Sequence, residues 1–245
     1  MKEFEAVLFD VGDTILHARA FKPTEALELA MRPVYDHLNG LGFGLPPFKR
    51  YIRRMKYGFV WAFVWSRITR REISVVKGMR RLHAQMGVEL ELQQTGDLCH
   101  RSIDAVSTIF TVDADALTVV EQLRDAGLKL GLVSNTVLPG LTIDDFLGQQ
   151  GFLDYFPVRV YSSDVGYMKP DRRIFALALD RIGVSAERTL FVGDRLDNDI
   201  KGASRVGMTT ALYVRGDKDP GARPRPDYVF RSLAEVPDII LRQRS

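Results

Sequence analysis

Short runs of apolar, often β-branched residues recur along much of the chain, and each run ends in a polar residue. Continuous apolar runs, unlike alternating ones, are typical of strands that are buried on both faces of a parallel sheet. The pattern predicts strands at residues 6–9, 128–133, 158–161, 189–192, 210–214 and 228–230. It predicts helices at residues 115–126, 171–182 and 197–206, each followed by a glycine that stops the helix. This alternation indicates an α/β fold with a Rossmann-like, doubly wound parallel sheet.

Residues 17–110 break the alternation, because their apolar positions recur at helical spacing. The pattern predicts four helices there, at residues 23–40, 47–71, 72–86 and 91–107, and no strand. We therefore expect a helical insertion, residues 17–109, after the first strand. Residues 1–16 and 110–245 would form the α/β core.

The composition indicates an ordinary globular protein rather than a membrane-spanning or disulfide-rich one. The chain has 245 residues, of which 46% are hydrophobic and 27% charged, as in an ordinary globular protein. It holds no apolar stretch of about 20 residues, so we expect no transmembrane helix. The first residues lack the pattern of a secretory signal. Cys99 is the only cysteine, which excludes an internal disulfide and favours a cytoplasmic location.

The net charge of +3 is unevenly distributed. Residues 17–110 contain 15 Lys and Arg against 8 Asp and Glu, whereas the rest of the chain is net acidic. Two interpretations remain open: an anionic ligand held between the two parts, or a solvated helical surface.

The polar residues at the predicted strand ends carry the candidate chemistry. Ligands of an open α/β sheet bind where the strands end. The relevant positions are Asp10, Ser134 with Asn135, Lys169 at the start of a helix, and Asp194 followed by Asp197 and Asp199. Carboxylates gathered there would hold Mg²⁺, while Lys169 and Ser134 would bind a phosphate. Taken alone, each residue has a structural explanation, such as a helix cap or a turn, and Asp197 fits a cap or a surface acid.

Four motifs in order resemble those of the haloacid dehalogenase superfamily of hydrolases. They are "LFDVGDT" at 8–14, "VSNT" at 133–136, Lys169 in "YMKPDRRIF" and "VGDRLDND" at 192–199. The resemblance covers residues 1–16 and about 110–240 and implies a Mg²⁺-dependent phosphatase with a helical cap. No G-x-G-x-x-G turn follows a strand, and a phospho-receiver domain would lack the helical insertion.

The resemblance also implies roles for individual residues. Asp10 would be the nucleophile that forms an aspartyl-phosphate. Ser134, Asn135 and Lys169 would bind the transferring phosphate. Mg²⁺ would be held by Asp10, Asp194 and the backbone carbonyl of Gly12, with Asp199 holding metal-bound water or Lys169.

The first motif departs from the family pattern D-x-D-x-T, in which the second Asp acts as general acid and base. Here Gly12 occupies that position and Asp13 follows it. Asp13 could take the catalytic role, or the enzyme could work without the acid on good leaving groups, or the site could bind phosphate and turn over very slowly. We favour the last two, because a shift of one residue points a side chain elsewhere. A 2-haloacid dehalogenase is a further alternative, although Asp194 and Asp199 argue for a metal site.

The expected cap contains the stretch "YGFVWAFVWSRITRR" at residues 57–71. Its aromatics at 57, 61 and 65 share one helical face. They would either form a substrate wall with Arg67, Arg70 and Arg71, or pack within the cap or against a second subunit. His17 and Arg19 follow the first motif. Either could touch the substrate, but we favour a surface loop for both. We expect a small phosphorylated substrate, no nucleic acid, no membrane, and a monomer or homodimer.

Overall fold

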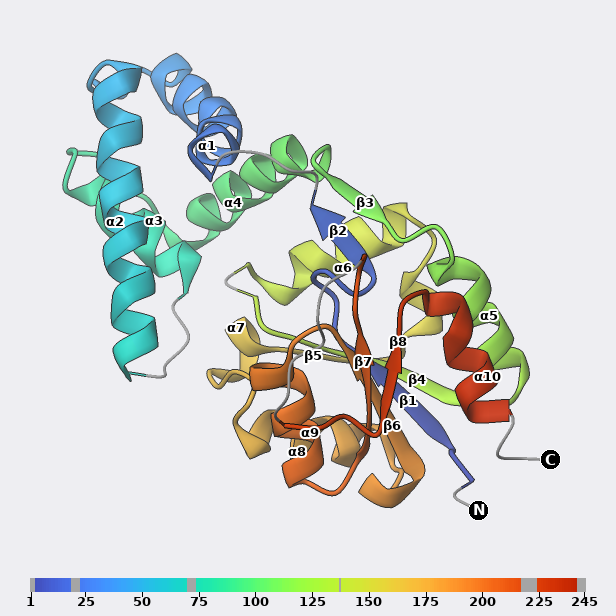
Figure 1. The fold of residues 1–245 in the computed structure, drawn as a ribbon. Helices are drawn as coiled ribbons and strands as arrows, with labels where there is room; N and C mark the ends of the chain where they lie inside the picture. Colours follow the sequence, from blue (N-terminus) through green and yellow to red (C-terminus); the bar gives the residue numbers. More distant parts are fainter. Residues whose placement is uncertain (1–2, 19–22, 70–73, 137, 217–223, 242–245) are drawn as a thin grey trace.

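A single parallel sheet forms the centre of the molecule. The structure, a computed structural model, describes residues 3–18, 23–69, 74–136, 138–216 and 224–241. Six strands lie in the order β5-β4-β1-β6-β7-β8 (Figure 1). Their bounds are β1 (Ala6–Phe9), β4 (Lys129–Ser134), β5 (Val158–Tyr161), β6 (Thr189–Gly193), β7 (Thr209–Tyr213) and β8 (Tyr228–Phe230). The expected α/β fold is confirmed, with β1 at the point where the strand order reverses.

Helices cover both faces of the sheet because its strands are apolar on both sides. Val7 and Phe9 of β1 belong to the core cluster that includes side chains of α5 (Ala116–Asp125), α6 (Gly140–Gln149) and α10 (Val236–Leu241). Ala6 and Leu8 point to the other face, where α8 (Arg172–Ile182) and α9 (Lys201–Arg205) pack. The short α7 (Ser162–Val165) follows β5. Four single turns complete the core: η1 (Leu153–Tyr155), η2 (Ala186–Arg188), η3 (Leu196–Ile200) and η4 (Leu233–Glu235).

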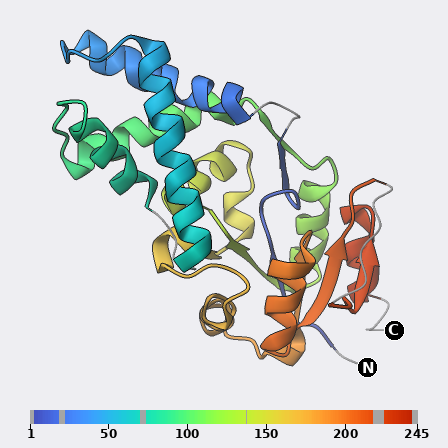
Figure 2. The ribbon, with the colours of Figure 1, turned by 60° about the vertical axis from the view of Figure 1, so that its left-hand side comes forward.

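Four helices form a separate unit beyond one end of the sheet (Figures 1 and 2). They are α1 (Pro23–Gly40), α2 (Phe48–Thr69), α3 (Val75–Ala84) and α4 (Leu92–Ser107), hereafter the helical insertion. The insertion has its own apolar core, to which Tyr51, Met55 and the buried Cys99 contribute. No helix in the described part of the chain is long and apolar enough to cross a membrane.

Two short strands join the insertion to the core, and the sequence pattern did not predict them. β2 (Leu16–Ala18) pairs antiparallel with β3 (Phe110–Val112). Each has three residues, too few for a periodic signal, and each is a strand only because the fold brings the other beside it. The expected boundaries of the insertion, residues 17 and 109, fall inside β2 and just before β3. Helix α6 was also not predicted, because its sequence GLTIDDFLGQ has weak amphipathic periodicity.

Candidate active site

Asp10 lies directly after the central strand, where neighbouring strands position it from both sides. Its backbone N–H donates to Val192 O of β6 at 2.9 Å, which continues the ladder one residue beyond β1. The next residues turn back sharply, because Val11 O accepts hydrogen bonds from the N–H groups of Ile15 and Leu16. Asp10 itself is only 6% exposed. Its carboxylate therefore lies inside the protein at the sheet edge, where the sequence places it.

Lys169 joins two carboxylates in the interior. Its Nζ lies 2.6 Å from Asp10 Oδ1 and 2.7 Å from Asp199 Oδ1. Burial by itself would lower the pKa of the Lys169 ammonium, but the charges of Asp10 and Asp199 outweigh burial and raise the pKa. Burial raises the pKa of the Asp10 carboxyl to about 6, with Lys169 opposing that rise and Asp199 adding to it. Lys169 is thus a fixed cation beside the candidate nucleophile.

Asn135 holds the backbone of Lys169 from the end of β4. Lys169 N–H donates to Asn135 Oδ1 at 2.7 Å, and Asn135 Nδ2 donates to Lys169 O at 2.9 Å. This two-point contact indicates that Asn135 positions the lysine. Binding of substrate by Asn135 stays a prediction.

Ser134 is the last residue of β4 and is 6% exposed. β4 lies next to β1, with Phe9 in register with Leu132, so Ser134 and Asp10 end adjacent strands. Thr14 of the first motif is fully buried, and its Oγ1 has no hydrogen-bond partner among the described residues.

The carboxylates of Asp10, Asp194 and Asp199 form a cluster suited to a cation. They offer ligand oxygens that all lie within 4.8 Å of one another. Burial, followed by the charges of Asp10 and Asp199, raises the pKa of Asp194 to about 7. Asp194 Oδ1 is buried and has no hydrogen-bond partner in the described part of the chain. A hard divalent cation such as Mg²⁺ would satisfy this oxygen and offset the repulsion, so the residues fit the ion.

Asp199 depends on a glycine that the sequence analysis did not single out. Asp199 is fully buried, and its Oδ2 accepts a hydrogen bond from Arg195 N–H at 3.0 Å. A Cβ on Gly193 would lie 2.6 Å from Asp199 Cγ and 2.7 Å from its Cβ. Gly193 therefore makes room for Asp199 beside β6. The available signal was its place in "VGD", before the strand-end acid.

The turn after Asp10 contains both features of the unusual first motif. A Cβ on Gly12 would meet no atom within 4 Å. Asp13 is exposed and has a φ of 57°, in the left-handed region that Asp tolerates better than most residues. Asp13 N–H donates to Leu16 O at 2.7 Å. The turn is held by backbone hydrogen bonds, and the charge of Asp13 is among those that raise the pKa of Asp194.

Other residues singled out from the sequence have different surroundings. Asp197 is exposed and ion-paired with Arg195 at 3.2 Å, as expected of a surface acid. The surface-loop interpretation of His17 is wrong, because His17 is 3% exposed and its Nε2 lies 2.8 Å from Asp113 Oδ2. Tyr57, Trp61 and Trp65 are exposed, so the interpretation that they pack within the helical insertion is wrong. The substrate wall and the contact with a second subunit stay predictions. Arg19, Arg70 and Arg71 lie outside the described residues, as does the side chain of Arg67.

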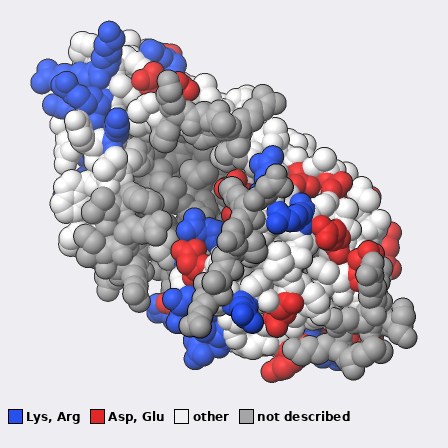
Figure 3. All heavy atoms as spheres, viewed as in Figure 1, with Lys and Arg blue, Asp and Glu red and all other residues white. Residues whose placement is uncertain are grey.

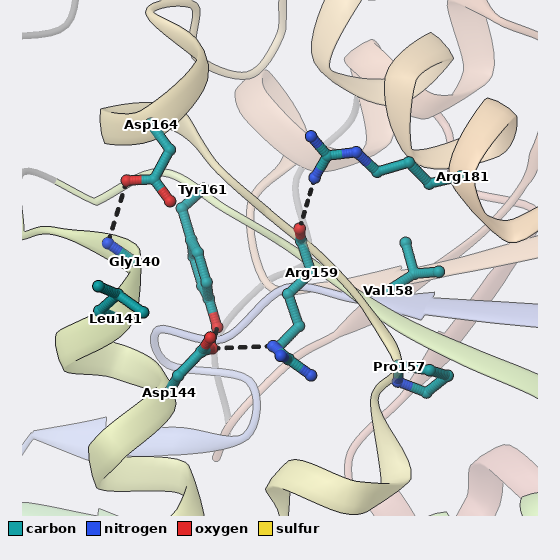
Figure 4. Close-up of a pocket in the computed structure, with 9 residues that line it drawn as sticks. All are labelled: Gly140, Leu141, Asp144, Pro157, Val158, Arg159, Tyr161, Asp164 and Arg181. Atoms are coloured by element: carbon teal, nitrogen blue, oxygen red, sulfur yellow. Dashed lines mark hydrogen bonds and ion pairs between the residues drawn. The ribbon is translucent and has the colours of Figure 1, made fainter.

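A cavity of about 430 Å³ lies along the edge strand β5 and includes none of the motif residues (Figure 4). Its charged side chains bond to one another or to backbone groups. Asp144 Oδ1 accepts from Tyr161 OH at 2.6 Å and pairs with Arg159 Nε at 2.9 Å. Arg181 donates to Arg159 O, and Gly140 N–H donates to Asp164. The cavity is separate from the carboxylate cluster.

Known proteins resemble this chain over different lengths. Glyceraldehyde 3-phosphate phosphatase of Methanopyrus kandleri is 37% identical over 51% of this chain and 55% of its own length. A relative of the same name from Methanocaldococcus jannaschii is 38% identical, and the match covers 52% of it. The chain thus spans about half the length of these two relatives. The putative HAD-hydrolase YfnB of Bacillus subtilis is 28% identical over 98% of this chain and 97% of its own length.

Solved structures share the whole architecture. A HAD phosphatase from Thermococcus onnurineus superposes with a TM-score of 0.64 at 28% identity, over 97% of this chain and 98% of that one. A 2-haloacid dehalogenase from Pseudomonas syringae reaches 0.69 at 22% identity over 98% and 99%, which shows a shared fold. The family model of haloacid dehalogenase-like hydrolases matches residues 4–207. The chain therefore belongs to the family of haloacid dehalogenase-like hydrolases.

Proposed function

We propose that this hydrolase is a Mg²⁺-dependent phosphatase of small phosphomonoesters, with Asp10 as the nucleophile. The observation that carries the proposal is the buried Asp10–Lys169–Asp199 bridge with Asp194 beside it. Asp10 follows β1 and Asp194 follows β6, whereas Asp199 lies in η3 and Lys169 lies just before α8. Together they combine a nucleophile, a fixed cation and a candidate metal site. Relatives named as phosphatases of glyceraldehyde 3-phosphate and of phosphoserine support the same reaction class.

The proposed reaction has two displacements at phosphorus. An Asp10 carboxylate oxygen forms a bond to phosphorus while the ester P–O bond breaks, and the leaving oxygen takes up a proton from water. Water then attacks the aspartyl-phosphate, inorganic phosphate leaves, and the Asp10 carboxylate is restored.

Charge on the phosphate oxygens is offset by groups that are already in place. Lys169 stays protonated because two carboxylates surround it, and it supplies positive charge without rearrangement. Ser134 would donate a hydrogen bond from the end of β4. Asp10, Asp194 and the Gly12 carbonyl would hold Mg²⁺, which when bound supplies further positive charge beside the phosphate. Asp199 would hold Lys169 in position.

The proposed active site has no general acid at the position where the family resemblance leads us to expect one. Gly12 has no side chain to protonate the leaving oxygen, and a general acid typically contributes about 10²–10⁴-fold to the rate. We therefore propose that the enzyme prefers substrates with good leaving groups. The same observation favours a second candidate function, a phosphate-binding protein with little turnover. Dehalogenation of 2-haloacids fits less well, because three clustered carboxylates call for a cation.

Hydrolysis of p-nitrophenyl phosphate tests the proposal, since its leaving group needs little protonation. We expect activity with Mg²⁺, loss of activity with chelator, and no detectable activity for Asp10→Asn in either condition. Circular dichroism should show that Asp10→Asn is folded. Activity that survives chelation or the substitution would contradict the mechanism. Phosphate binding without hydrolysis would favour the second candidate, and metal-independent release of halide from a 2-haloacid would favour dehalogenation.

A further inference from the structure

Arg195 lies between two of the clustered carboxylates in the sequence and is held next to both. It directly follows Asp194, so the Cα atoms of these two residues are about 3.8 Å apart. Its backbone N–H donates to Asp199 Oδ2 at 3.0 Å, which fixes its main chain against a second member of the cluster. The chain therefore places an arginine at the rim of the candidate active site.

The Arg195 guanidinium is oriented but not covered. Its Nε and Nη2 donate to the two carboxylate oxygens of Asp197, each at 3.2 Å, and the side chain remains 49% exposed. A guanidinium has five N–H donors, so three of these have no hydrogen-bond partner among the described residues. They include one N–H on each Nη atom, and that pair can donate to both oxygens of one carboxylate. An exposed ion pair adds little stability, so the main effect of Asp197 is to fix the direction of the guanidinium.

The guanidinium also lies within the electrostatic field of the cluster. The hydrogen bonds with Asp197 are the largest cause that raises the pKa of Arg195, and the charges of Asp194 and Asp199 add to that rise. Lys169 differs, because its side chain is only 2% exposed and lies between two carboxylates. Arg195 is therefore a cation beside the cluster that a second group on the substrate can reach from solvent.

The charges around this position favour a ligand group with a single negative charge. The carboxylates at the cluster and its rim outnumber the two cations Lys169 and Arg195; they belong to Asp10, Asp13, Asp194, Asp197 and Asp199. A carboxylate adds one negative charge and matches the planar guanidinium, whereas a second phosphate adds almost two and calls for a further cation. The Lys and Arg side chains of the helical insertion that Figure 3 shows gather at its outer end, away from the sheet domain.

We propose that Arg195 binds a carboxylate on the leaving group of the substrate, so that the preferred substrates are phosphate esters of hydroxy acids. This inference rests on the proposed function, because it requires the phosphate to be held at Asp10. The two exposed Nη donors bind the carboxylate, and Asp197 is the positioning residue that points the guanidinium toward it. A carboxylate held in this way orients the leaving group without taking part in bond making or breaking.

Two aryl phosphates of similar shape test the proposal: 3-carboxyphenyl phosphate and its neutral amide, 3-carbamoylphenyl phosphate. With Mg²⁺, we expect the wild type to prefer the carboxylate by about 10-fold or more in kcat/KM, mainly through a lower KM. Arg195→Gln should lose this preference. Arg124→Gln is the matched control, because Arg124 also donates through Nε and Nη2 to a neighbouring acid, Asp125. Arg124 lies near the end of α5, shortly before β4 begins, at the opposite edge of the sheet, so this variant should keep the preference.

Charge reversal gives a readout that a folding defect cannot produce. Arg195→Glu should prefer 3-(aminomethyl)phenyl phosphate, which carries an ammonium group, over 3-carboxyphenyl phosphate.

The outcomes separate this inference from the proposed function. Hydrolysis without a preference for the carboxylate, a preference that survives Arg195→Gln, or equal losses on both substrates in that variant would overturn the role of Arg195 and leave the phosphatase function standing. A larger preference of the wild type for 1,3-phenylene bisphosphate would overturn the choice of a carboxylate. No hydrolysis of any aryl phosphate, including p-nitrophenyl phosphate, would overturn the proposed function and this inference with it.

Discussion

Gly12 stands where the family resemblance of the first motif leads us to expect a second aspartate, and the structure leaves room for a side chain there. A Cβ at Gly12 meets no atom within 4 Å. A side chain can therefore be added without displacing Asp10 or the backbone hydrogen bonds of the turn. Under the proposed function, one substitution at position 12 would therefore be enough to supply the general acid.

Gly12→Asp should consequently raise turnover on substrates with poor leaving groups. The expected gain is about 10²–10⁴-fold for an alkyl phosphate and much less for p-nitrophenyl phosphate, because only the alkyl leaving group needs a proton. Steady-state kcat/KM for both substrates measures the difference. An equal gain on both, or no gain on either, would show that proton transfer is not what limits this enzyme.

At a second glycine, Gly193, there is no room for a side chain, because an added Cβ would clash with Asp199. Gly193→Ala should displace Asp199 and with it Lys169, so we expect a loss of p-nitrophenyl phosphate hydrolysis of about 10-fold or more, corresponding to roughly 1.4 kcal/mol in the barrier. Gly96→Ala on α4 is the comparison, since a Cβ there meets nothing within 4 Å. Similar activities for the two variants would mean that the position of Asp199 does not matter.

Among the elements, the helical insertion contains a buried histidine that links two helices. His83 Nδ1 contacts Met79 O at 2.8 Å, and its Nε2 contacts the Tyr51 hydroxyl at 3.1 Å. A carbonyl can only accept, so Nδ1 carries the proton and Nε2 accepts from Tyr51. Burial lowers the pKa of His83 from its ordinary value of 6.5, despite the opposing bond to Met79. The ring is therefore neutral in the folded insertion.

This histidine makes the stability of the insertion depend on pH. Below about pH 6.5 the unfolded chain binds a proton that the folded chain does not, so the free energy of unfolding falls as pH decreases. Urea unfolding at pH 7.5 and 5.5, followed by the fluorescence of Trp61 and Trp65 on α2, measures the effect. His83→Gln should lose less stability between these pH values than wild type. The same loss in both proteins would contradict this assignment.

Across the whole molecule, the two connections between core and insertion meet at one polar cluster. His17 of β2 bonds Asp113, which directly follows β3, and Tyr213 of β7 donates to the same Asp113 oxygen at 3.1 Å. His17 Nδ1 is already buried without a hydrogen-bond partner among the described residues. Asp113 thus ties both connecting strands to the central sheet.

Asp113→Ala should lower the free energy of unfolding by about 1–3 kcal/mol, because it leaves the His17 ring buried without its partner. Tyr213→Phe should cost less, about 0.5–1.5 kcal/mol, because the contact between His17 and Asp113 remains. Chemical denaturation gives the free energy of unfolding of each variant and so shows which residue, Asp113 or Tyr213, contributes more to stability. A larger loss in Tyr213→Phe than in Asp113→Ala would contradict the proposed order.

Much of the core was predictable from the chain alone because its signals are local. A buried strand needs a continuous apolar run, and residues such as Asp10 and Asp194 come directly after one. Parallel strands end at a common edge, so the approximate site followed from the strand positions. The four helices of the insertion followed from their periodicity in the same way, to within a few residues at each end.

The tertiary structure alone decided the contacts between distant segments. β2 and β3 exist because residues almost a hundred positions apart become neighbours, and that pairing also buries His17. The close approach of Gly193 to Asp199 and the two-point hold of Asn135 on Lys169 depend on distances that no residue pattern encodes. Periodicity placed Tyr57, Trp61 and Trp65 on one face of α2, but only the packing of α2 against its neighbours decided that this face meets solvent. A sequence determines which side chains an element presents, whereas the packing of elements determines what those side chains touch.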